Sequence, residues 1–430
     1  MSEDFLQTIW KNRWFTPKEY KSSDGRIVNI ISSGYLNEND GPDFTNAKVE
    51  IDGILWAGNI EIHTNASDWN THGHNKDANY NNVILHVTNH ADKEVFTSNH
   101  SPLCTIEIEY SQHYEKNLLL LLNSLNTIAC STSIHLIDNF FIKHWLTQLA
   151  TDRLEWRCIK IKQQLKTFTN DWENAFYITL ARYFGFGINN TPFEQLARSI
   201  PIVIISKHYG NIFQLEALFF GQAGLLTAPY SDQYHEKLAL EYHFLCEKYG
   251  LKPIDATYWK FMRIRPSNFP TIRIAEFVAL LNLVPRLFEQ CLMFTSLDSL
   301  KAFLTVNVSE YWQKHYVFAK EHPSKTKHLG SNSSSLLLIN AVIPFIFAYG
   351  KFKNNESLCD RAMTFYESLQ AESNSIISKW IGLNIVPSNA MESQALLHLN
   401  EFYCKDKKCL QCNIGQRICE QSLNKTIENN

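Results

Sequence analysis

The chain has 430 residues, too many for one compact hydrophobic core and typical of two or three domains. Its composition, 45% hydrophobic and 19% charged, is that of an ordinary globular protein and excludes a disordered or fibrous one. The formal net charge of -3 excludes a general electrostatic attraction to nucleic acid, so binding of a polyanion would need a local basic patch.

The predicted elements begin with a helix at residues 5–14, which have helical apolar spacing. The following segment changes to short alternating runs bounded by Gly, Asn and Asp, which predict strands at 27–31, 47–51, 54–63, 83–87 and 103–109. From about residue 140 the pattern is helical, with amphipathic stretches at 141–168, 172–184 and 233–248. We therefore predict an α+β protein with a strand-rich domain at 1–125, a mostly α-helical domain at 140–400 and a cysteine loop at 401–421.

The ends and the apolar runs predict a cytoplasmic protein with no membrane association. The first residues, Met1-Ser-Glu-Asp-Phe-Leu, lack the basic start and long apolar stretch of a secretory signal. The longest apolar run, 336–349, is interrupted by Asn340 and Pro344 and is too short to span a bilayer. Six scattered cysteines are expected to be small buried hydrophobic residues: Cys104, Cys130, Cys158, Cys246, Cys291 and Cys359.

A β-hairpin is predicted where Asp52-Gly53 joins two alternating apolar runs. On a two-residue turn, one face is expected to pack on a core and carries Ala47, Val49, Ile51, Ile54, Trp56, Ile60 and Ile62. Glu61 and His63 share the opposite, polar face. The hairpin therefore presents a carboxylate and an imidazole side by side.

Pro42-Asp43 followed by Glu61-Ile-His63 resembles the PD-(D/E)XK nuclease pattern, which implies a restriction-endonuclease-like N-terminal domain. By that resemblance Asp43 and Glu61 hold Mg²⁺ or Mn²⁺, and His63 takes the place of the lysine. The two-residue turn sets Asp43 across from Ile62, so a bulge or bend near Gly41-Pro42, or a three-residue turn, is needed. The alternative is a structural hairpin with a solvated polar face.

More histidines and acidic residues follow directly. Within the segment 63–86 the sequence carries His63, Asp68, His72, His74, Asp77 and His86. Imidazole and carboxylate together suit Zn²⁺, Mn²⁺ or Fe²⁺. His72, His74 and Asp77 can bind such an ion directly, or form a proton-transfer shell around the hairpin site. His86, inside a predicted strand, is more typical of a hydrogen-bonded core histidine.

These motifs carry a resemblance to one family. The stretch from Gly41-Pro-Asp-Phe through Gly58-Asn-Ile-Glu-Ile-His, with Ser-Asp-Trp, His-Gly-His and Leu-His-Val after it, looks like the bacterial family catalogued as domain of unknown function 2851. The likeness continues through 263–273, 340–344 and the cysteine-bearing end. The resemblance implies a complete family member and brings no established activity, so the reaction has to be argued from the residues.

Two groups of basic residues are candidates for contacting phosphate. Arg263, Arg265 and Arg273 surround a Pro-bounded turn, and guanidinium groups held by such a turn suit phosphate oxygens. A second basic stripe is predicted on one helix face, from Arg153, Arg157 and Lys160. The alternatives are salt bridges between domains for the first group and a solvated helix face for the second.

The C-terminal segment contains Cys404, Cys409, Cys412 and Cys419 with spacing C-x4-C-x2-C-x6-C. Four thiolates close a tetrahedral site, so Zn²⁺ is the first expectation. The loop also looks like the iron-sulfur loop that ends some DNA glycosylases, although the spacing differs, so [4Fe-4S] stays open. Either metal would be structural and would lock the loop onto the helical domain. The alternative is that the cysteines are incidental.

Three functional hypotheses follow. The first is a Mg²⁺- or Mn²⁺-dependent nuclease or phosphodiesterase, in which Asp43, Glu61 and His63 converge. The second is a non-enzymatic module that binds nucleic acid or protein, with the polar groups of the hairpin pointing apart. The third is a mononuclear metal enzyme acting on a small molecule, in which His72, His74 and Asp77 meet. A P-loop and a Gly-x-Ser-x-Gly elbow do not occur in the sequence.

Overall fold

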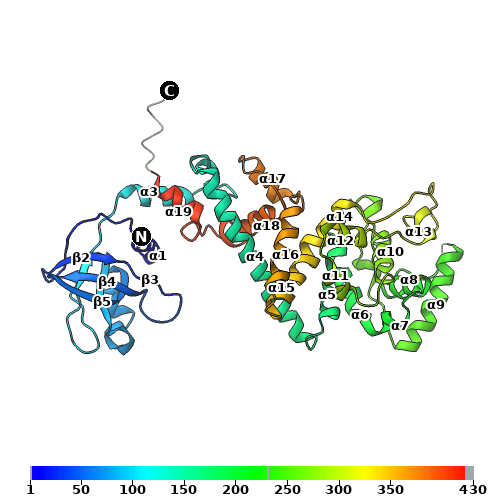
Figure 1. Cartoon of the computed structure of the whole chain (residues 1–430), viewed down its shortest axis with the longest axis horizontal. Coiled ribbons are helices and arrows are strands. Elements are labelled where there is room, and N and C mark those ends of the chain that lie inside the picture. The colour runs from blue at the N-terminus through cyan, green and yellow to red at the C-terminus, as the bar shows by residue number, and fades with distance from the viewer. Residues whose placement is uncertain (1, 230–231, 422–430) are drawn as a thin grey trace, which may run out of the picture. The chain divides into compact units, whose positions relative to one another are not determined.

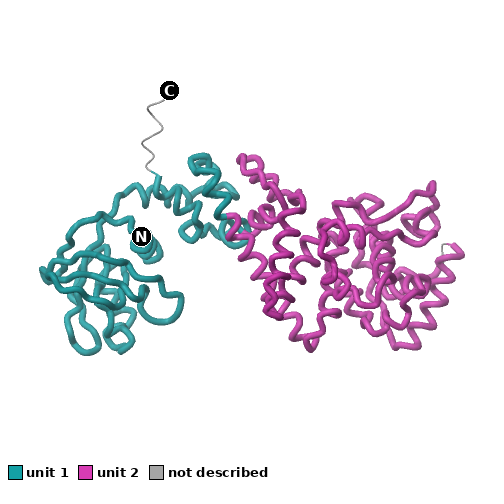
Figure 2. Tube along the Cα trace, in the orientation of Figure 1, with its two compact units in different colours: residues 1–145, 399–430 teal, residues 146–398 magenta. Residues whose placement is uncertain are grey.

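The structure is a computed structural model that describes residues 2–229 and 232–421 (Figure 1). The chain divides into two compact units, one formed by Met1–Trp145 with Leu399–Asn430 and the other by Leu146–His398 (Figure 2). The predicted α+β composition is confirmed, because the first unit contains a sheet and the second is helical. The C-terminal segment differs from expectation, since it belongs to the first unit and not to the helical one.

The first unit is built on one mixed sheet with the strand order β1-β2-β4-β5-β6-β7, and β3 pairs with β4 outside this path. Its strands are β1 (Tyr20–Lys21), β2 (Ile27–Ser32), β3 (Tyr35–Leu36), β4 (Phe44–Ile51), β5 (Ile54–Asn65), β6 (Val83–His90) and β7 (Thr105–Glu107). The pairs from β1 to β5 are antiparallel, whereas β6 runs parallel to β5 and β7 runs parallel to β6. The site described below lies on β5 and β6, where the two arrangements meet.

The hairpin of β4 and β5 has the predicted two-residue turn, with Ile51 opposite Ile54. Asp52 and Gly53 both have positive φ, 49° and 77°, which matches the twist of the strands. Further along, the register shifts by one residue between Ala47 and Phe44. A bulge is therefore present, although it lies three to five residues beyond the predicted position near Gly41-Pro42.

The hairpin is buried differently from the expectation. Ile54 and Trp56 were predicted to pack on a core, but they are 62% and 47% exposed. Leu55, which points to the other face, is also exposed, so both faces of the hairpin are open to solvent beside the turn. In contrast, Glu61 and His63 are buried, so the alternative of a hairpin with a solvated polar face is wrong.

The polar face of β5 is buried because the connection from β5 to β6 folds over it. This connection contains the short helix α2 (Asp68–Thr71) and two 3-10 turns, His74–Lys76 and Ala78–Tyr80. Trp69 of α2 is fully buried and forms a small core with Ala66, Val83, Val95 and Leu103. The local apolar cluster around one tryptophan therefore holds the histidine-rich segment against the sheet.

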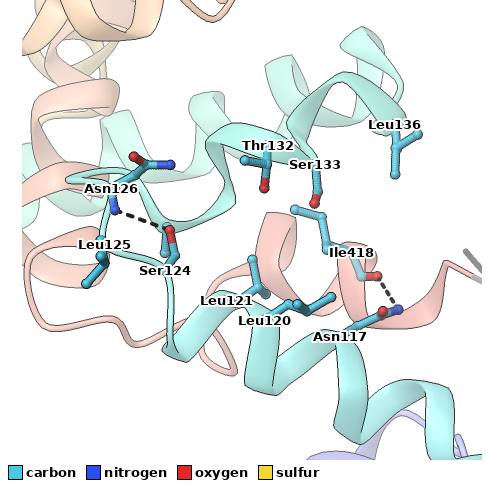
Figure 3. A pocket seen from close by; sticks show the side chains of 11 residues that line it. Asn117, Leu120, Leu121, Ser124, Leu125, Asn126, Thr132, Ser133, Leu136 and Ile418 are labelled. Carbon is cyan, nitrogen blue, oxygen red and sulfur yellow. Dashed lines mark hydrogen bonds between the residues drawn. The ribbon is translucent and has the colours of Figure 1, made fainter.

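Segments from both ends of the chain form the helical part of the first unit. Its helices are α1 (Glu3–Lys11), α3 (Gln112–Leu122), the first part of α4 (Asn139–Thr167) and α19 (Asn413–Glu420), with 3-10 turns at Ala129–Thr132 and Ile134–Leu136 and a π-helical turn at Asn400–Cys404. Helix α19 packs beside α3, and Asn117 Nδ2 of α3 donates to Ile418 O at 3.2 Å (Figure 3). The C-terminal segment is thereby fixed to the strand-bearing unit.

The second unit has no named strand among its described residues, contains two isolated β-bridges and begins within α4. Its helices are α5 (Trp172–Phe184), α6 (Asn190–Ser199), α7 (Ile202–Lys207), α8 (Ile212–Gln222), α9 (Gln233–Tyr249), α10 (Pro270–Leu281), α11 (Leu287–Met293), α12 (Leu297–Leu304), α13 (Glu310–Lys314), α14 (Ser331–Leu337), α15 (Ile343–Phe352), α16 (Glu356–Ser368), α17 (Ser375–Ile381) and α18 (Ala390–Leu399). A π-helical turn, Leu338–Val342, joins α14 to α15. The helix Ser331–Phe352 is long and apolar enough to cross a membrane, and 67% of its apolar window is buried inside the unit.

Candidate functional site

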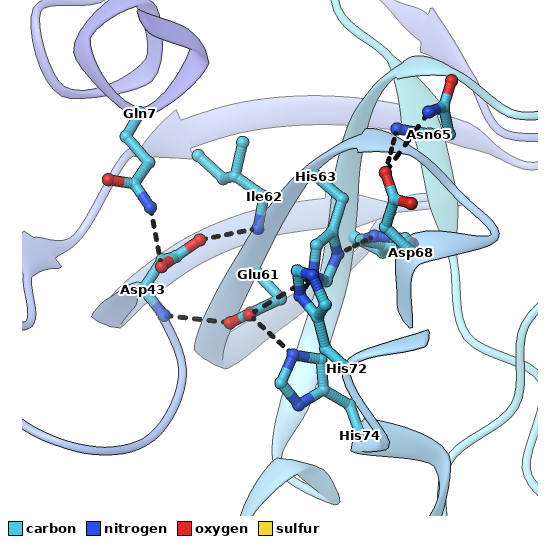
Figure 4. A network of polar contacts seen from close by, with 10 residues as sticks. Gln7, Asp43, Glu61, Ile62, His63, Asn65, Asp68, His72 and His74 are labelled. Atoms are coloured by element: carbon cyan, nitrogen blue, oxygen red, sulfur yellow. Dashed lines mark hydrogen bonds and ion pairs between the residues drawn. The ribbon is translucent and has the colours of Figure 1, made fainter. Parts of the chain in front are cut away.

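Asp43 and Glu61 lie side by side at the bulged end of the hairpin (Figure 4). The backbone N–H of Asp43 donates to Glu61 Oε2 at 3.0 Å. The Asp43 carboxylate accepts from Gln7 Nε2 of α1 at 2.8 Å and from Ile62 N at 3.0 Å. The one-residue shift in β4 produces this arrangement, because an uninterrupted register would place Asp43 opposite Ile62.

The two carboxylates form an anionic pair that is largely shielded from water. Glu61 is 5% exposed. Burial, and then the neighbouring Glu61 carboxylate, raise the pKa of Asp43 to about 7. Within the described residues no lysine or arginine forms an ion pair with either carboxylate, and the nearest basic groups to Glu61 are the imidazoles of His63 and His74. Such a pair fits a divalent cation, which would neutralise both charges.

His63 continues the site along β5, and its neighbours fix its protonation. The Thr105 hydroxyl donates to Leu103 O at 3.2 Å, so its oxygen is free to accept from His86 Nδ1 at 3.5 Å. The pKa of His86 is lowered well below its usual value by burial, so this ring holds one proton. We assign that proton to Nδ1 on the basis of the Thr105 contact, which leaves His86 Nε2 to accept from His63 Nδ1 at 2.8 Å.

His63 therefore presents an unprotonated nitrogen to the carboxylates. Burial lowers its pKa to about 3, and the nearby His74 and His72 add to this effect. With its single proton on Nδ1, the Nε2 lone pair faces His72 Nδ1 at 3.1 Å and Glu61 Oε1 at 3.8 Å. An imidazole held in one tautomer by a second hydrogen bond is able to bind a metal or accept a proton.

The connection after β5 supplies two further histidines. His74 Nε2 lies 3.3 Å from Glu61 Oε1, and its ring stacks on Tyr80 with a centroid distance of 3.9 Å. One nitrogen from each of His63, His72 and His74 lies within 4.8 Å of the others, close enough to hold one metal ion. Asp77 is outside this group and accepts instead from Asn79 N at 2.9 Å. The predicted grouping of His72 and His74 with Asp77 is thus replaced by one with His63.

Some residues of the site were not predicted from the sequence. Gln7 lies on α1 and reaches Asp43 across 36 positions of sequence, so no local spacing could have indicated it. Glu3, on the same helix, interacts electrostatically with His72 and Glu61. Trp69 packs against three of the histidine rings, and the Ser-Asp-Trp motif in a polar segment was the available signal.

The arginines that were predicted to bind phosphate are partly exposed and partly buried. Arg263 and Arg265 are exposed, whereas Arg273 is buried and pairs with Glu276 at 2.7 Å. The predicted phosphate-binding role of Arg273 is therefore not supported, because its guanidinium is held inside the helical unit. The predicted basic stripe is also wrong, since Arg153 and Arg157 are buried and bind Gln394 Oε1 at 2.6 and 3.0 Å.

Three of the four predicted C-terminal cysteine ligands lie around one small cavity. Cys404, Cys409 and Cys412 line it, whereas Cys419 does not. All ten cysteines of the chain are free thiols. The predicted four-cysteine set is thus only partly brought together.

The protein is thus an α+β protein with a buried cluster of carboxylates and histidines on a mixed sheet. The chain belongs to the family described as "Protein of unknown function (DUF2851)", which it matches over residues 3–375. The match contains every residue of the cluster and ends before the cysteine-bearing segment. Comparisons with curated proteins and with solved structures found no match.

Proposed function

We propose that the protein is a metal-dependent hydrolase of the PD-(D/E)XK nuclease kind, acting on phosphodiester bonds of nucleic acid. The observation that carries this proposal is the pairing of Asp43 with Glu61 beside an unprotonated His63 nitrogen. In this reading the sheet unit has a restriction-endonuclease-like core. We also propose a cytoplasmic location, where nucleic acid and Mg²⁺ are both available.

Asp43 and Glu61 would hold Mg²⁺ or Mn²⁺, a cation that polarises the scissile phosphate and lowers the pKa of bound water. Gln7 and the backbone N–H of Ile62 orient the Asp43 oxygens and prevent the carboxylate from rotating. His63 Nε2 accepts the proton of the attacking water, because its other nitrogen is already committed to His86. A lysine at this position would supply positive charge, whereas this histidine supplies a base.

Cleavage assays test the proposal directly. Purified wild-type protein is incubated with single- and double-stranded DNA and RNA in Mg²⁺, Mn²⁺ or EDTA. We expect cation-dependent cleavage that Glu61→Gln lowers at least about 100-fold, because one of two metal-binding carboxylates is lost. Glu50→Gln, on the same hairpin but with its side chain near Asn29, is the matched control and should retain full activity.

Two outcomes would overturn this assignment. Full activity in Glu61→Gln would remove the hairpin from the catalytic site. An absence of cleavage under every condition would favour a non-enzymatic module that binds nucleic acid or protein, and filter binding with the same substrates would then measure that activity.

A second candidate is a mononuclear transition-metal centre acting on a small molecule. It is favoured by one observation, the approach of His63, His72 and His74 within 4.8 Å of one another. Three imidazoles suit Zn²⁺, Mn²⁺ or Fe²⁺ and are poor ligands for Mg²⁺. His72→Ala distinguishes the two candidates, since it should abolish tight Zn²⁺ binding by this centre while leaving Mg²⁺-dependent cleavage within a few-fold of wild type.

A further inference from the structure

A fourth cysteine joins the three that line the C-terminal cavity. Cys130, on the 3-10 turn Ala129–Thr132, lines the same cavity as Cys404, Cys409 and Cys412. The cavity is almost wholly apolar, and its remaining lining residues are Ala129, Tyr403, Lys408 and Gly415. Two segments far apart in the sequence therefore bring four thiols to one small cavity.

The helix geometry explains why Cys419 is absent from this group. Helix α19 begins directly after Cys412 and contains Cys419 near its end. Seven residues of α-helix advance by roughly 10 Å, so Cys419 does not line the cavity, although it remains within electrostatic range of Cys409. Its thiol is buried on the helix, and Asn117 Nδ2 of α3 binds its backbone carbonyl at 3.2 Å.

The loop is shaped to surround the four thiols closely. A Cβ atom at Gly415 would lie 2.2 Å from Cys409 O, so only glycine permits the loop to fold back onto the start of α19. Burial raises the pKa of the Cys412 thiol, and hydrogen bonds from the backbone N–H groups of Gly415 and Ile414 oppose that rise. Hydrogen bonds from backbone N–H groups to sulfur are what a metal-bound thiolate needs.

A buried indole also lies beside Cys412. Trp145 is 5% exposed, and its indole N–H is close enough to Cys412 to oppose the rise in the pKa of that thiol that burial causes. A thiolate accepts a hydrogen bond more strongly than a neutral thiol, so this donor would gain a stronger acceptor if Cys412 bound a metal.

The separation of the sulfurs distinguishes between two kinds of metal group. Four thiolates around one Zn²⁺ at about 2.3 Å are roughly 3.8 Å from one another. Among the residues that the structure describes, only His63, His72 and His74 place three ligand atoms within 4.8 Å, so no three cysteine sulfurs do. In an iron-sulfur cluster each thiolate binds a different iron atom, and the sulfurs are further apart.

We propose that Cys130, Cys404, Cys409 and Cys412 ligate an iron-sulfur cluster of the [4Fe-4S] type, with Cys419 outside the ligand set. The cluster is structural, since it ties the C-terminal segment to the 3-10 turn after α3. Lys408 at the cavity, with Lys407 beside Cys409, partly balances the negative charge of four thiolates. This inference does not depend on hydrolysis at the histidine site.

Metal analysis of the full chain tests the ligand set. The protein is purified without oxygen, and its iron, acid-labile sulfide and zinc are measured together with its visible absorption. We expect about four iron and four sulfide per chain in the wild type, their loss in Cys130→Ser and their retention in Cys419→Ser. One zinc per chain in place of iron overturns the proposal, as does loss of iron in Cys419→Ser with retention in Cys130→Ser.

A second measurement uses the wild type alone, since Cys130→Ser can also disturb folding. Cysteines are alkylated before and after oxidative removal of the cluster, and the modified positions are mapped by mass spectrometry. The positions released by cluster removal should be Cys130, Cys404, Cys409 and Cys412. Release of Cys419 instead of Cys130 contradicts the assignment, whatever the variants do.

Discussion

At the scale of single residues, Asp43 is in an unfavourable electrostatic position in the absence of a cation. Its carboxyl is shielded from water and adjacent to that of Glu61, and these effects raise its pKa from 3.8 to about 7. When the pKa of a carboxyl is higher in the folded state than in the unfolded state, there is a pH range in which only the folded protein keeps the proton. Stability therefore falls as pH rises from about 4 to about 7, and a divalent cation would restore it.

Replacing Asp43 should separate this electrostatic effect from packing. In EDTA, we expect Asp43→Asn to raise the free energy of unfolding by on the order of 2 kcal/mol at pH 8, with little difference at pH 4. Chemical denaturation at several pH values measures this, with exposed Asp40→Asn as control. Mg²⁺ or Mn²⁺ should stabilise the wild type and not Asp43→Asn. A variant that is less stable than wild type at pH 8 would contradict the expectation.

At the scale of elements, the bulge in β4 decides whether the two carboxylates meet. It coincides with Asn46, whose φ of 56° is in the left-handed region. Asparagine tolerates this conformation, whereas β-branched residues do not. On the N-terminal side of the bulge, the pairing of β4 with β5 is shifted by one residue. The backbone conformation at the bulge therefore controls the face on which Asp43 lies.

Substitutions at Asn46 test this control. We expect Asn46→Gly to be tolerated and Asn46→Val to destabilise the protein by roughly 1–3 kcal/mol, because valine is strained at positive φ. Lys48→Val, exposed on the same strand, is the matched control and should have a small effect. Mn²⁺ binding by calorimetry should weaken in Asn46→Val more than in Lys48→Val. Equal binding in the two valine variants would mean that the bulge does not position the site.

At the scale of the whole molecule, a buried arginine of the helical unit donates hydrogen bonds to backbone carbonyls of the same unit. Arg157 Nη1 donates to Ile339 O at 2.9 Å, inside the π-helical turn that interrupts the α14–α15 helix. Tyr366 Oη donates to the same carbonyl at 2.7 Å. A π-helical turn leaves carbonyls poorly paired within the helix, and these side chains pair them. The arginine face predicted to be basic and solvated is therefore part of the core.

Arg157→Ala should consequently affect stability before any binding property. We expect the free energy of unfolding to fall by roughly 2–4 kcal/mol, since buried polar groups lose their partner. Lys160→Ala, on an exposed position of the same helix, should change stability by less than about 0.5 kcal/mol. Urea denaturation of both variants measures this. A loss of nucleic-acid affinity in Arg157→Ala without a loss of stability would return Arg157 to a binding surface.

Local sequence determined the position of several helices and turns. Helix α5 occupies the predicted range 172–184, because Asp171 caps it by accepting from Asn174 N at 3.1 Å and apolar periodicity continues to its end. The Asp52-Gly53 turn likewise has the predicted conformation, since both residues tolerate positive φ. Caps, turns and periodicity act over a few residues, so they can be identified without the fold.

Tertiary structure decided what those elements do. The need for a bulge followed from the sequence, but its place at Asn46 depends on the packing of β4 against its neighbours. Gln7 at the carboxylates and Cys130 at the cysteine cavity come from segments far from their partners, and no spacing indicates such contacts. The burial of Arg157 was also hidden, because a charged residue at helical spacing looks the same whether solvent or a carbonyl faces it. Sequence records which groups are available, whereas packing between distant segments determines which of them meet.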